Sequence, residues 1–242
     1  MVRSTVLLRR EGAPVLSLSL IINTYNRRHL LLPLLGAIQR QTLEAFEVVI
    51  ADDGSSDGTP QSARQLAPSL RYPLKVVTQE DRGFRAAASR NNGARAAAGS
   101  QLVFMDDDCL PSDQYLQLYR AARAPETLLR GDIIFVPSFD HLDQALEVKR
   151  AADDLWGANF SVPADLFWKI GGFDEDFIDE AGEDTDLHLR LLRAGAADRR
   201  VEGAEVWHLG HHHAGGLSRN LFWDQKVHDQ SIRRNLRGDE RR

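Results

Sequence analysis

The chain has a single cysteine, Cys109, so it cannot form an internal disulfide, which suits a reducing compartment. It also has no uninterrupted apolar run near the roughly 18 residues that a membrane-spanning helix needs. Arg3, Arg9 and Arg10 interrupt the N-terminal region, which therefore lacks the apolar core of a signal peptide. We expect a cytoplasmic protein without a transmembrane segment, and peripheral contact with the inner face of a membrane stays open.

An excess of positive charge is absent too. Thirty Lys and Arg residues face 35 Asp and Glu residues, which gives a formal net charge of −5. Nucleic-acid binding relies on a basic surface, so we expect no nucleic-acid partner, and any phosphate site must be local. At 242 residues, of which 43% are hydrophobic, the chain can bury the core of one large domain. We place this domain at residues 1–217, followed by a helical, Arg-rich tail at residues 218–242.

Apolar runs alternate with helical patterns along the first half of the chain. Strands are predicted at Val15–Ile22, Phe46–Ala51, Leu74–Thr78 and Leu102–Met105, and helices at Leu30–Ile38 and Ala86–Ala98. The second half adds strands at Leu128–Val136, Phe160–Val162 and Ala204–Trp207, and helices at Asp165–Ile170 and Asp184–Ala194. Such alternation predicts an α/β fold, with a Rossmann-like, mostly parallel central sheet flanked by helices in a single domain.

Polar side chains follow three of the predicted strands, at the point where each strand ends. They occupy residues 23–26, 52–57 and 106–108. Ligands of parallel sheets bind in the crevice beyond the carboxyl ends of the strands. We therefore expect these three segments to form one site.

The third segment consists of three consecutive aspartates, Asp106, Asp107 and Asp108. Their mutual repulsion must be offset by a cation or by hydrogen-bond donors. An aspartate-rich turn without a ligand is the alternative, but a position directly after a buried strand favours a metal site. Hard oxygen ligands favour Mg²⁺ or Mn²⁺, which commonly bridge carboxylates to substrate phosphates.

The second segment holds Asp53 and Asp57 in a turn rich in glycine and serine. A carboxylate here, of Asp52 or Asp53, can accept hydrogen bonds from a nucleobase or a ribose, whereas Asp57 is placed to cap the next helix. Arg82, Arg85 and Arg90 lie around the start of the helix predicted at 86–98. One of these guanidinium groups could bind a diphosphate, and surface ion pairing is the alternative.

Two further groups stand near the end of the chain. Glu183 and Asp184 begin a predicted helix, where a carboxylate either caps the helix or, being ionised, acts as a general base. His208 and three consecutive histidines that begin at His211 follow a predicted strand, and one or two of them could complete a Mn²⁺ site begun by Asp108. A structural zinc site has little support because no partner cysteine lies nearby.

Seven motifs follow one another along the chain: LSLIINTYNR, FEVVIADDGSSDGT, DRGFRAAASRNNGARAAAGSQLVFMDDDC, GANFSVP, GGFDEDF, GEDTDLHLRLLRAG and VWHLGHHH. Their ordered combination, over about residues 16–213, resembles that of family 2 glycosyltransferases with the GT-A fold. The last motifs are similar to those of bacterial members whose C-terminal part is like that of galactosyltransferases. The resemblance implies a nucleoside-diphosphate sugar as donor and a glycan, a lipid-linked or another hydroxyl as acceptor.

The resemblance also implies roles for individual residues in nucleotide binding. Thr24, Tyr25 and Asp53 match positions that hold the base. Arg85 or Arg90 lies where a basic residue approaches the nucleotide.

For the metal, the resemblance implies that Asp106 and Asp108 are the first and last members of the DxD element. Asp106 faces the ribose or the metal, and Asp108 is a metal ligand, with Asp107 as the alternative that a triple aspartate offers. His208 matches a late metal ligand, with His211 as a substitute. The expected ion is Mn²⁺ or Mg²⁺.

For catalysis, Asp184 matches the general base of inverting members, with Glu183 beside it. Asn159 and Phe160 fall in the segment that borders the donor sugar and the acceptor. The expected function is transfer of a sugar with inversion. A retaining GT-A transferase and a noncatalytic nucleotide-sugar-binding module are the alternatives.

Two other enzyme classes are disfavoured. A sugar nucleotidyltransferase would need a glycine-rich loop after the first predicted strand, but that loop, NTYNRR, has no glycine. A haloacid-dehalogenase phosphatase would need its paired aspartates after the first strand.

Overall fold

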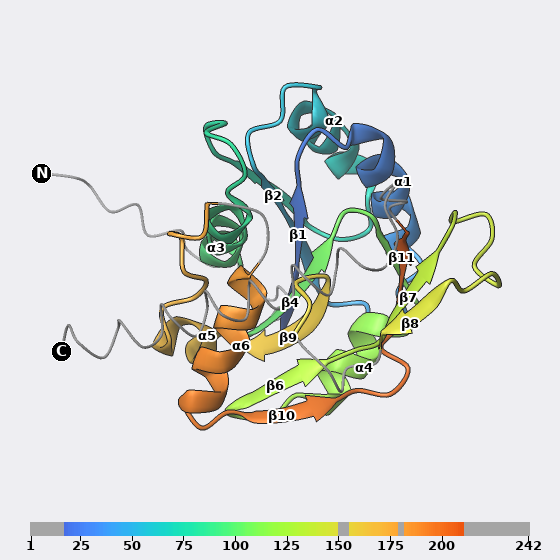
Figure 1. Cartoon of the computed structure of the whole chain (residues 1–242). Helices are drawn as coiled ribbons and strands as arrows, with labels where there is room; N and C mark the ends of the chain where they lie inside the picture. The colour runs from blue at the N-terminus through green and yellow to red at the C-terminus, as the bar shows by residue number, and fades with distance from the viewer. Residues whose placement is uncertain (1–16, 150–154, 179–181, 211–242) are drawn as a thin grey trace, which may run out of the picture.

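A computed structural model describes residues 17–149, 155–178 and 182–210 of the chain. Over these residues the chain forms two β-sheets and six α-helices (Figure 1). Within these ranges, no helix is long and apolar enough to cross a membrane. The boundary expected at residue 217, the tail at residues 218–242 and His211 all lie outside the described residues.

The larger sheet has the strand order β10-β6-β9-β4-β1-β2-β3. Its strands are β1 (Leu18–Thr24), β2 (Glu47–Asp52), β3 (Leu74–Thr78), β4 (Gln101–Asp106), β6 (Thr127–Arg130), β9 (Asn159–Pro163) and β10 (Ala197–Arg200). Strand β9 runs antiparallel to both of its neighbours, and the other pairings within this sheet are parallel. The prediction of a mostly parallel, Rossmann-like α/β sheet is confirmed.

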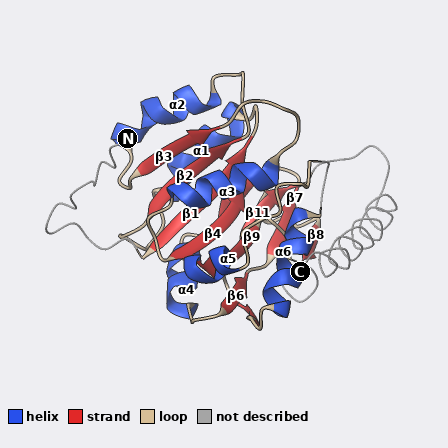
Figure 2. Cartoon of the chain, turned by 90° about the vertical axis from the view of Figure 1, so that its left-hand side faces the viewer, coloured by secondary structure: helices blue, strands red, loops and turns tan. Residues whose placement is uncertain are grey.

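Helices cover both faces of this sheet. One core joins Leu20 and Ile22 of β1 to α1 (Arg28–Ile38), α2 (Thr59–Leu66) and α4 (Tyr115–Ala122). The other core joins Ile21 of β1 to α3 (Ala86–Ala96), α5 (Ala164–Lys169) and α6 (Glu183–Arg193), which lie on the near side of the sheet in Figure 2. A short 3₁₀ turn, Ala67–Ser69, follows α2. Burial on both faces explains why the central strands are continuous apolar runs.

A smaller sheet has the strand order β5-β11-β7-β8. Its strands are β5 (Cys109–Pro111), β7 (Ile133–Val136), β8 (Glu147–Lys149) and β11 (Val206–Leu209). The prediction of one strand at Leu128–Val136 is wrong, because β6 belongs to the larger sheet and β7 to the smaller one. The break falls at Gly131, where a Cβ atom would lie 1.9 Å from the carbonyl oxygen of Ala204, so this close approach requires glycine.

Other differences from the predicted elements also have physical causes. Strand β11 begins later than the predicted strand at Ala204–Trp207, so His208 lies inside it rather than after it. Strand β10 was not predicted because all four of its residues are exposed and carry no apolar pattern. It is held by pairing with β6 and by the ion pair between Arg130 and Asp198, with Nε and Oδ1 2.7 Å apart. Helix α4 was missed because only three of its residues are buried.

Candidate active site

The three polar segments lie side by side, as their strand ends predicted. In the parallel ladders, Thr24 at the end of β1 is paired with Asp52 of β2, and Asn23 is paired with Asp106 of β4. The loop after β1 is also joined to the loop after β2, because the side chain of Asn26 accepts hydrogen bonds from the backbone of Ser56 and Asp57. The carboxyl ends of β1, β2 and β4 therefore share one rim.

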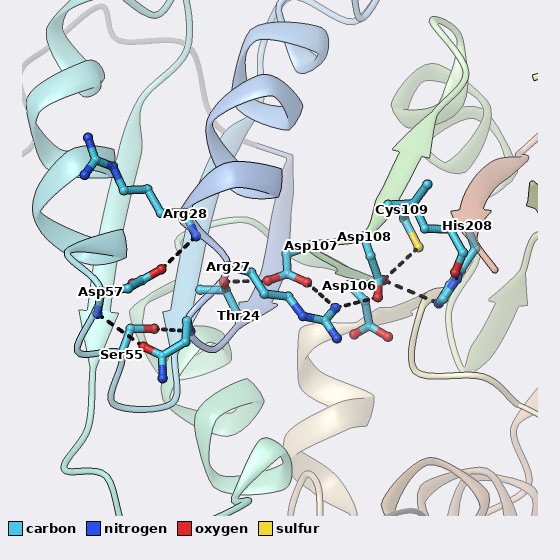
Figure 3. Close-up of polar contacts among 12 residues, drawn as sticks. Thr24, Arg27, Arg28, Ser55, Asp57, Asp106, Asp107, Asp108, Cys109 and His208 are labelled. Carbon is cyan, nitrogen blue, oxygen red and sulfur yellow. Dashed lines mark hydrogen bonds and ion pairs between the residues drawn. The ribbon is translucent and has the colours of Figure 1, made fainter. Parts of the chain in front are cut away.

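The rim centres on the three aspartates after β4 (Figure 3). Asp107 accepts a hydrogen bond from Thr24 Oγ1 at 2.6 Å, and Arg27 Nη1 lies 3.0 Å from its other oxygen. The same Arg27 nitrogen lies 2.5 Å from Asp108 Oδ2. Burial raises the pKa of Asp107 to about 7, since the hydrogen bond from Thr24 and the charge of Arg27 offset it only partly and Asp108 adds to it.

Asp108 has the surroundings of a metal ligand. Oxygen, nitrogen and sulfur atoms of Asp108, His208 and Cys109 lie within 4.8 Å of one another. His208 Nε2 lies 3.4 Å from Asp108 Oδ1, and its Nδ1 lies 2.7 Å from the carbonyl oxygen of Leu209. A histidine that donates from Nδ1 to a carbonyl carries its lone pair on Nε2, the atom that would bind a metal. The donor set of carboxylate and imidazole fits a divalent ion such as Mn²⁺.

The cysteine and histidine of this cluster are cross-strand neighbours. Strand β11 pairs with β5 so that His208 stands opposite Cys109. The thiol of Cys109 is fully buried, and burial holds its pKa well above the ordinary value, with the charges of Asp108 and Asp106 acting in the same direction. Cys109 therefore stays a neutral thiol beside Asp108, and the donors suited to an ion such as Mn²⁺ are the carboxylate of Asp108 and the imidazole of His208.

The expected nucleotide residues lie next to this cluster and differ in what they contact. Asp53 accepts a hydrogen bond from the backbone of Arg85 at 2.8 Å and from the side chain of Gln79 at 2.5 Å. Burial raises the pKa of Asp53 despite these bonds. Tyr25 is 44% exposed, and its hydroxyl donates to Asp81. Thr24, by contrast, is 1% exposed and donates to Asp107, so it supports the aspartate cluster and does not face open space.

Arg90 joins the aspartate cluster to α6. Its side chain is 6% exposed, with Nη2 2.8 Å from Asp106 Oδ1 and Nη1 2.6 Å from Glu183 Oε1. The guanidinium also lies over the ring of Phe173, 5.6 Å from its centroid. Arg90 was expected to approach the nucleotide, but in the structure both of these nitrogen atoms hold carboxylates. Through these two ion pairs, Arg90 connects the end of β4 to the start of α6.

Asp184 lies beside this connection at the N-terminus of α6. Gly182, which precedes the helix, has a φ of 116°, a left-handed conformation that favours glycine. The carboxylate of Asp184 accepts a hydrogen bond from the backbone of Gly157 at 3.0 Å. Burial and the neighbouring charge of Glu183 raise the pKa of Asp184 well above its ordinary value of 3.8. A carboxylate with a raised pKa is suited to accept a proton near neutral pH.

The side chains of Asn159 and Phe160 are buried. Asn159 is 2% exposed, and its side-chain oxygen accepts hydrogen bonds from the hydroxyls of Tyr115 and Tyr119. Its amide nitrogen donates to the carbonyl oxygens of Asp132 and Ala204. Phe160 is fully buried and stacks on Phe104, with ring centroids 4.8 Å apart. Both side chains therefore belong to the framework in this structure, and the expectation that their segment borders the donor sugar and the acceptor stays a prediction.

Sequence reasoning missed two contributors to the rim. Arg27 bridges two aspartates, and only its place in the loop after the first strand could have indicated this. The backbone of Gly157 holds Asp184, and a Cβ atom at this residue would lie 2.9 Å from Arg90 Nη2. A glycine in the GANFSVP motif was therefore a signal for close approach to the site.

Comparison with known sequences gives two matches that follow each other along the chain. A sequence model described as Glycosyl transferase family 2 matches residues 19–137. A second model, described as the N-terminal domain of galactosyltransferase, matches residues 138–213. The first match contains the strand ends that carry the aspartates, and the second contains α6 and His208.

Individual proteins agree with these matches. The chain is 37% identical to validoxylamine A glucosyltransferase from Streptomyces hygroscopicus subsp. jinggangensis, in an alignment that covers 87% of this chain and 60% of that protein. It is 27% identical to chondroitin synthase from Escherichia coli, over 79% of this chain and 34% of that protein. The chain thus spans 60% of the length of the first relative and 34% of the second.

Among solved structures, a mannosyltransferase from Pyrobaculum calidifontis in complex with GDP-Man and Mn²⁺ has the same fold. The TM-score is 0.60 at 23% identity, over 79% of this chain and 56% of that one. This likeness shows a shared GT-A fold. The two consecutive family matches and the 37% identity to validoxylamine A glucosyltransferase show that the chain belongs to the family 2 glycosyltransferases.

Proposed function

We propose that the chain transfers a sugar from a nucleoside-diphosphate sugar to an acceptor hydroxyl, with inversion at the anomeric carbon, and that Asp184 is the general base. One observation carries this proposal. Arg90 binds both Asp106 of the aspartate cluster and Glu183, the neighbour of Asp184. A group that can take a proton is thereby held at a set position relative to a group that can hold a metal and a diphosphate.

Asp108 and His208 would hold the divalent ion, either Mn²⁺ or Mg²⁺. When bound, this ion would neutralise the negative charge of the diphosphate leaving group. The fit of the donor set supports this assignment, as does the Mn²⁺ in the complex of the related mannosyltransferase. Asp53 and the exposed ring of Tyr25 flank the place proposed for the nucleoside.

Asp184 would take the proton of the attacking acceptor hydroxyl. Its backbone donors, Gly157 and Thr185, orient the carboxylate, and burial keeps its proton affinity high. Glu183, by contrast, is bound by Arg90 at 2.6 Å and is less available for proton transfer. Asp184 is therefore the better general base of the two.

The donor and the acceptor are proposed by chemical class. The names of the relatives support a hexosyl donor and a hydroxyl on a small polyol or a growing glycan. A lipid-linked hydroxyl is a third acceptor to test. The base of the donor is to be found among uridine, guanosine and thymidine diphosphates.

A thermal-shift screen of UDP, GDP and dTDP, with and without Mn²⁺, tests the binding part of this function. We expect one nucleotide to raise the melting temperature only when Mn²⁺ is present.

The variant Asp184→Asn tests whether Asp184 is the general base. It should keep the nucleotide-dependent thermal shift and lower turnover by about a hundredfold or more. Asp165→Asn is the matched control, because Asp165 also accepts a backbone hydrogen bond at a helix N-terminus but is exposed on the surface of α5.

The stereochemistry separates the remaining candidates. Proton NMR of the product made from an α-linked donor should show a β-linked sugar. An α-linked product would support a retaining transferase instead. Metal-dependent nucleotide binding without turnover on any acceptor would support a noncatalytic binding module.

A further inference from the structure

We propose that Arg27 is an exchangeable counter-cation: it neutralises Asp107 and Asp108 in the metal-free protein, and it moves to the diphosphate of the donor when the metal binds. This inference rests on the proposed function, because it assumes a metal at Asp108 and a diphosphate bound to that metal. It adds a donor-binding residue and an order of events that no assignment above includes.

Arg27 is placed for this role by the start of α1. It is the residue directly before the helix, and its side chain crosses toward the end of β4 (Figure 3). One nitrogen, Nη1, contacts both Asp107 Oδ1 at 3.0 Å and Asp108 Oδ2 at 2.5 Å. Both aspartates are only 3% exposed. Arg27 is therefore a cation that these two buried carboxylates share.

The exposure of Arg27 differs from that of the buried Arg90. The Arg27 side chain is 37% exposed, whereas the Arg90 side chain is 6% exposed. Arg90 could leave its carboxylates only by staying buried as an uncompensated charge, which is costly. Arg27 reaches its carboxylates from the solvent side, so it can leave them and remain hydrated.

A metal at Asp108 would compete with Arg27. Asp108 Oδ2 contacts Arg27, and Oδ1 lies 3.4 Å from His208 Nε2. A divalent ion between Asp108 and His208 would stand within a few ångströms of the guanidinium, and like charges at that separation repel each other. Metal binding should therefore weaken the contact between Arg27 and Asp108.

A released guanidinium stays on the same rim, because its backbone is anchored between β1 and α1. The diphosphate that the metal holds would be the anion closest to it. Arginine suits this exchange because its planar guanidinium can bind two phosphate oxygens at once. The neighbouring Arg28 does not share the position: its backbone nitrogen bonds Asp57, and its side chain points away from the aspartates (Figure 3).

The test compares Arg27→Gln with Arg28→Gln in two binding measurements on the full chain. In the first, Mn²⁺ binding is followed by electron paramagnetic resonance without nucleotide. Arg27→Gln should bind Mn²⁺ about fivefold more tightly than the wild type, because a competing charge is gone. In the second, binding of UDP and GDP is measured by calorimetry at saturating Mn²⁺. Arg27→Gln should bind the preferred nucleotide about tenfold more weakly, because a charge-assisted hydrogen bond is lost. Arg28→Gln should match the wild type in both.

The two effects have opposite signs, so a general loss of structure cannot produce them. Unchanged or weaker Mn²⁺ binding by Arg27→Gln would overturn the competition, and unchanged nucleotide binding would overturn the move to the diphosphate. A wild type that binds neither Mn²⁺ nor a nucleotide would instead refute the proposed function. If Arg27→Gln does not fold, Arg27→Lys keeps the charge but loses the planar fork. It should then show the weaker nucleotide binding with Mn²⁺ affinity close to that of the wild type.

Discussion

Buried carboxylates at the two ends of the central strands have pKa values shifted in opposite directions. At the start of β2, Glu47 is fully buried and accepts hydrogen bonds from Ser19 Oγ at 2.6 Å and the backbone of Ala98 at 2.5 Å. Lys75 Nζ lies 2.9 Å from its other oxygen. Burial alone would raise the pKa of Glu47, but these donors bring it below the ordinary value of 4.5. At the other end of the sheet, burial raises the pKa of Asp107 to about 7.

Both carboxylates are buried, and the difference lies in their donors and in the charges around them. Glu47 has a hydroxyl, a backbone N–H and an ammonium to itself, whereas Asp107 has the hydroxyl of Thr24, shares one guanidinium nitrogen with Asp108, and is repelled by the charges of Asp108 and Asp106. A satisfied buried carboxylate stabilises a fold, while an under-supplied one is set to bind a cation or a proton. We call the end of the sheet that holds Glu47 the framework end, and the end that holds Asp107 and Asp108 the working end.

The largest effect should come from removing the charge at the proposed metal ligand. Asp108→Asn should lower transfer by about a thousandfold, because the metal that neutralises the leaving group would lose its carboxylate ligand. It should also abolish the Mn²⁺-dependent thermal shift. Asp113→Asn is the control, since Asp113 lies a few residues away on the surface and forms an exposed pair with Arg40. Full activity in Asp108→Asn would show that the working end does not need this carboxylate to hold a metal.

The pH dependence of turnover should show the next effect. A general base acts only when ionised, and burial together with Glu183 raises the pKa of Asp184 above 3.8. Turnover at saturating substrates should therefore fall about tenfold for each pH unit below that raised value. Rates measured between about pH 5 and 9 should place this decline close to neutral pH. A decline only near pH 4 would mean that Asp184 has an ordinary pKa or is not the base.

At the framework end, Glu47→Gln should affect stability and spare the chemistry. Glutamine keeps an acceptor for Ser19 but turns a donor toward Lys75, so the free energy of unfolding should drop by about 1–2 kcal/mol at neutral pH. Urea unfolding measures this loss. Because the folded pKa of Glu47 is depressed, its contribution is present above the ordinary value of 4.5 and disappears as the pH falls through the folded value. The gap between variant and wild type should therefore close in acid. A lower turnover per folded molecule would contradict a purely structural role.

The working end could be predicted from the sequence to the extent that topology determines it. Parallel strands must end at one edge, so the segments after β1, β2 and β4 were expected together, and their ladders bring them together. Which of two adjacent arginines would face the aspartates was not predictable. Arg27 and Arg28 are chemically identical, and only the residue at which α1 begins sends one inward and the other outward.

Contacts between distant segments were not predictable from local patterns. Tyr115 and Tyr119 of α4 donate hydrogen bonds to the side chain of Asn159. That helix was not predicted, so nothing in the sequence supplied the two hydroxyls. The break between β6 and β7 likewise depends on the approach of Ala204 to Gly131, which local patterns do not encode.

The smallest effect should come from Asp107→Asn, and its sign is the sharpest test of the comparison. Asp107 binds its proton more tightly in the folded state than an ordinary aspartate, so its ionisation lowers the stability of the metal-free protein as the pH rises from about 4 to about 7. Asparagine still accepts the hydrogen bond from Thr24 and does not ionise, but it turns its amide nitrogen toward Arg27, which limits the gain. The variant should be more stable than the wild type by up to about 1 kcal/mol at neutral pH, and equal to it near pH 4. Urea unfolding without metal measures this gain, which is opposite in sign to the loss expected for Glu47→Gln. A destabilised variant would show that the pairing with Arg27 outweighs the repulsion. If Asp107→Asn loses the Mn²⁺-dependent thermal shift, Asp107 and not Asp108 is the metal ligand.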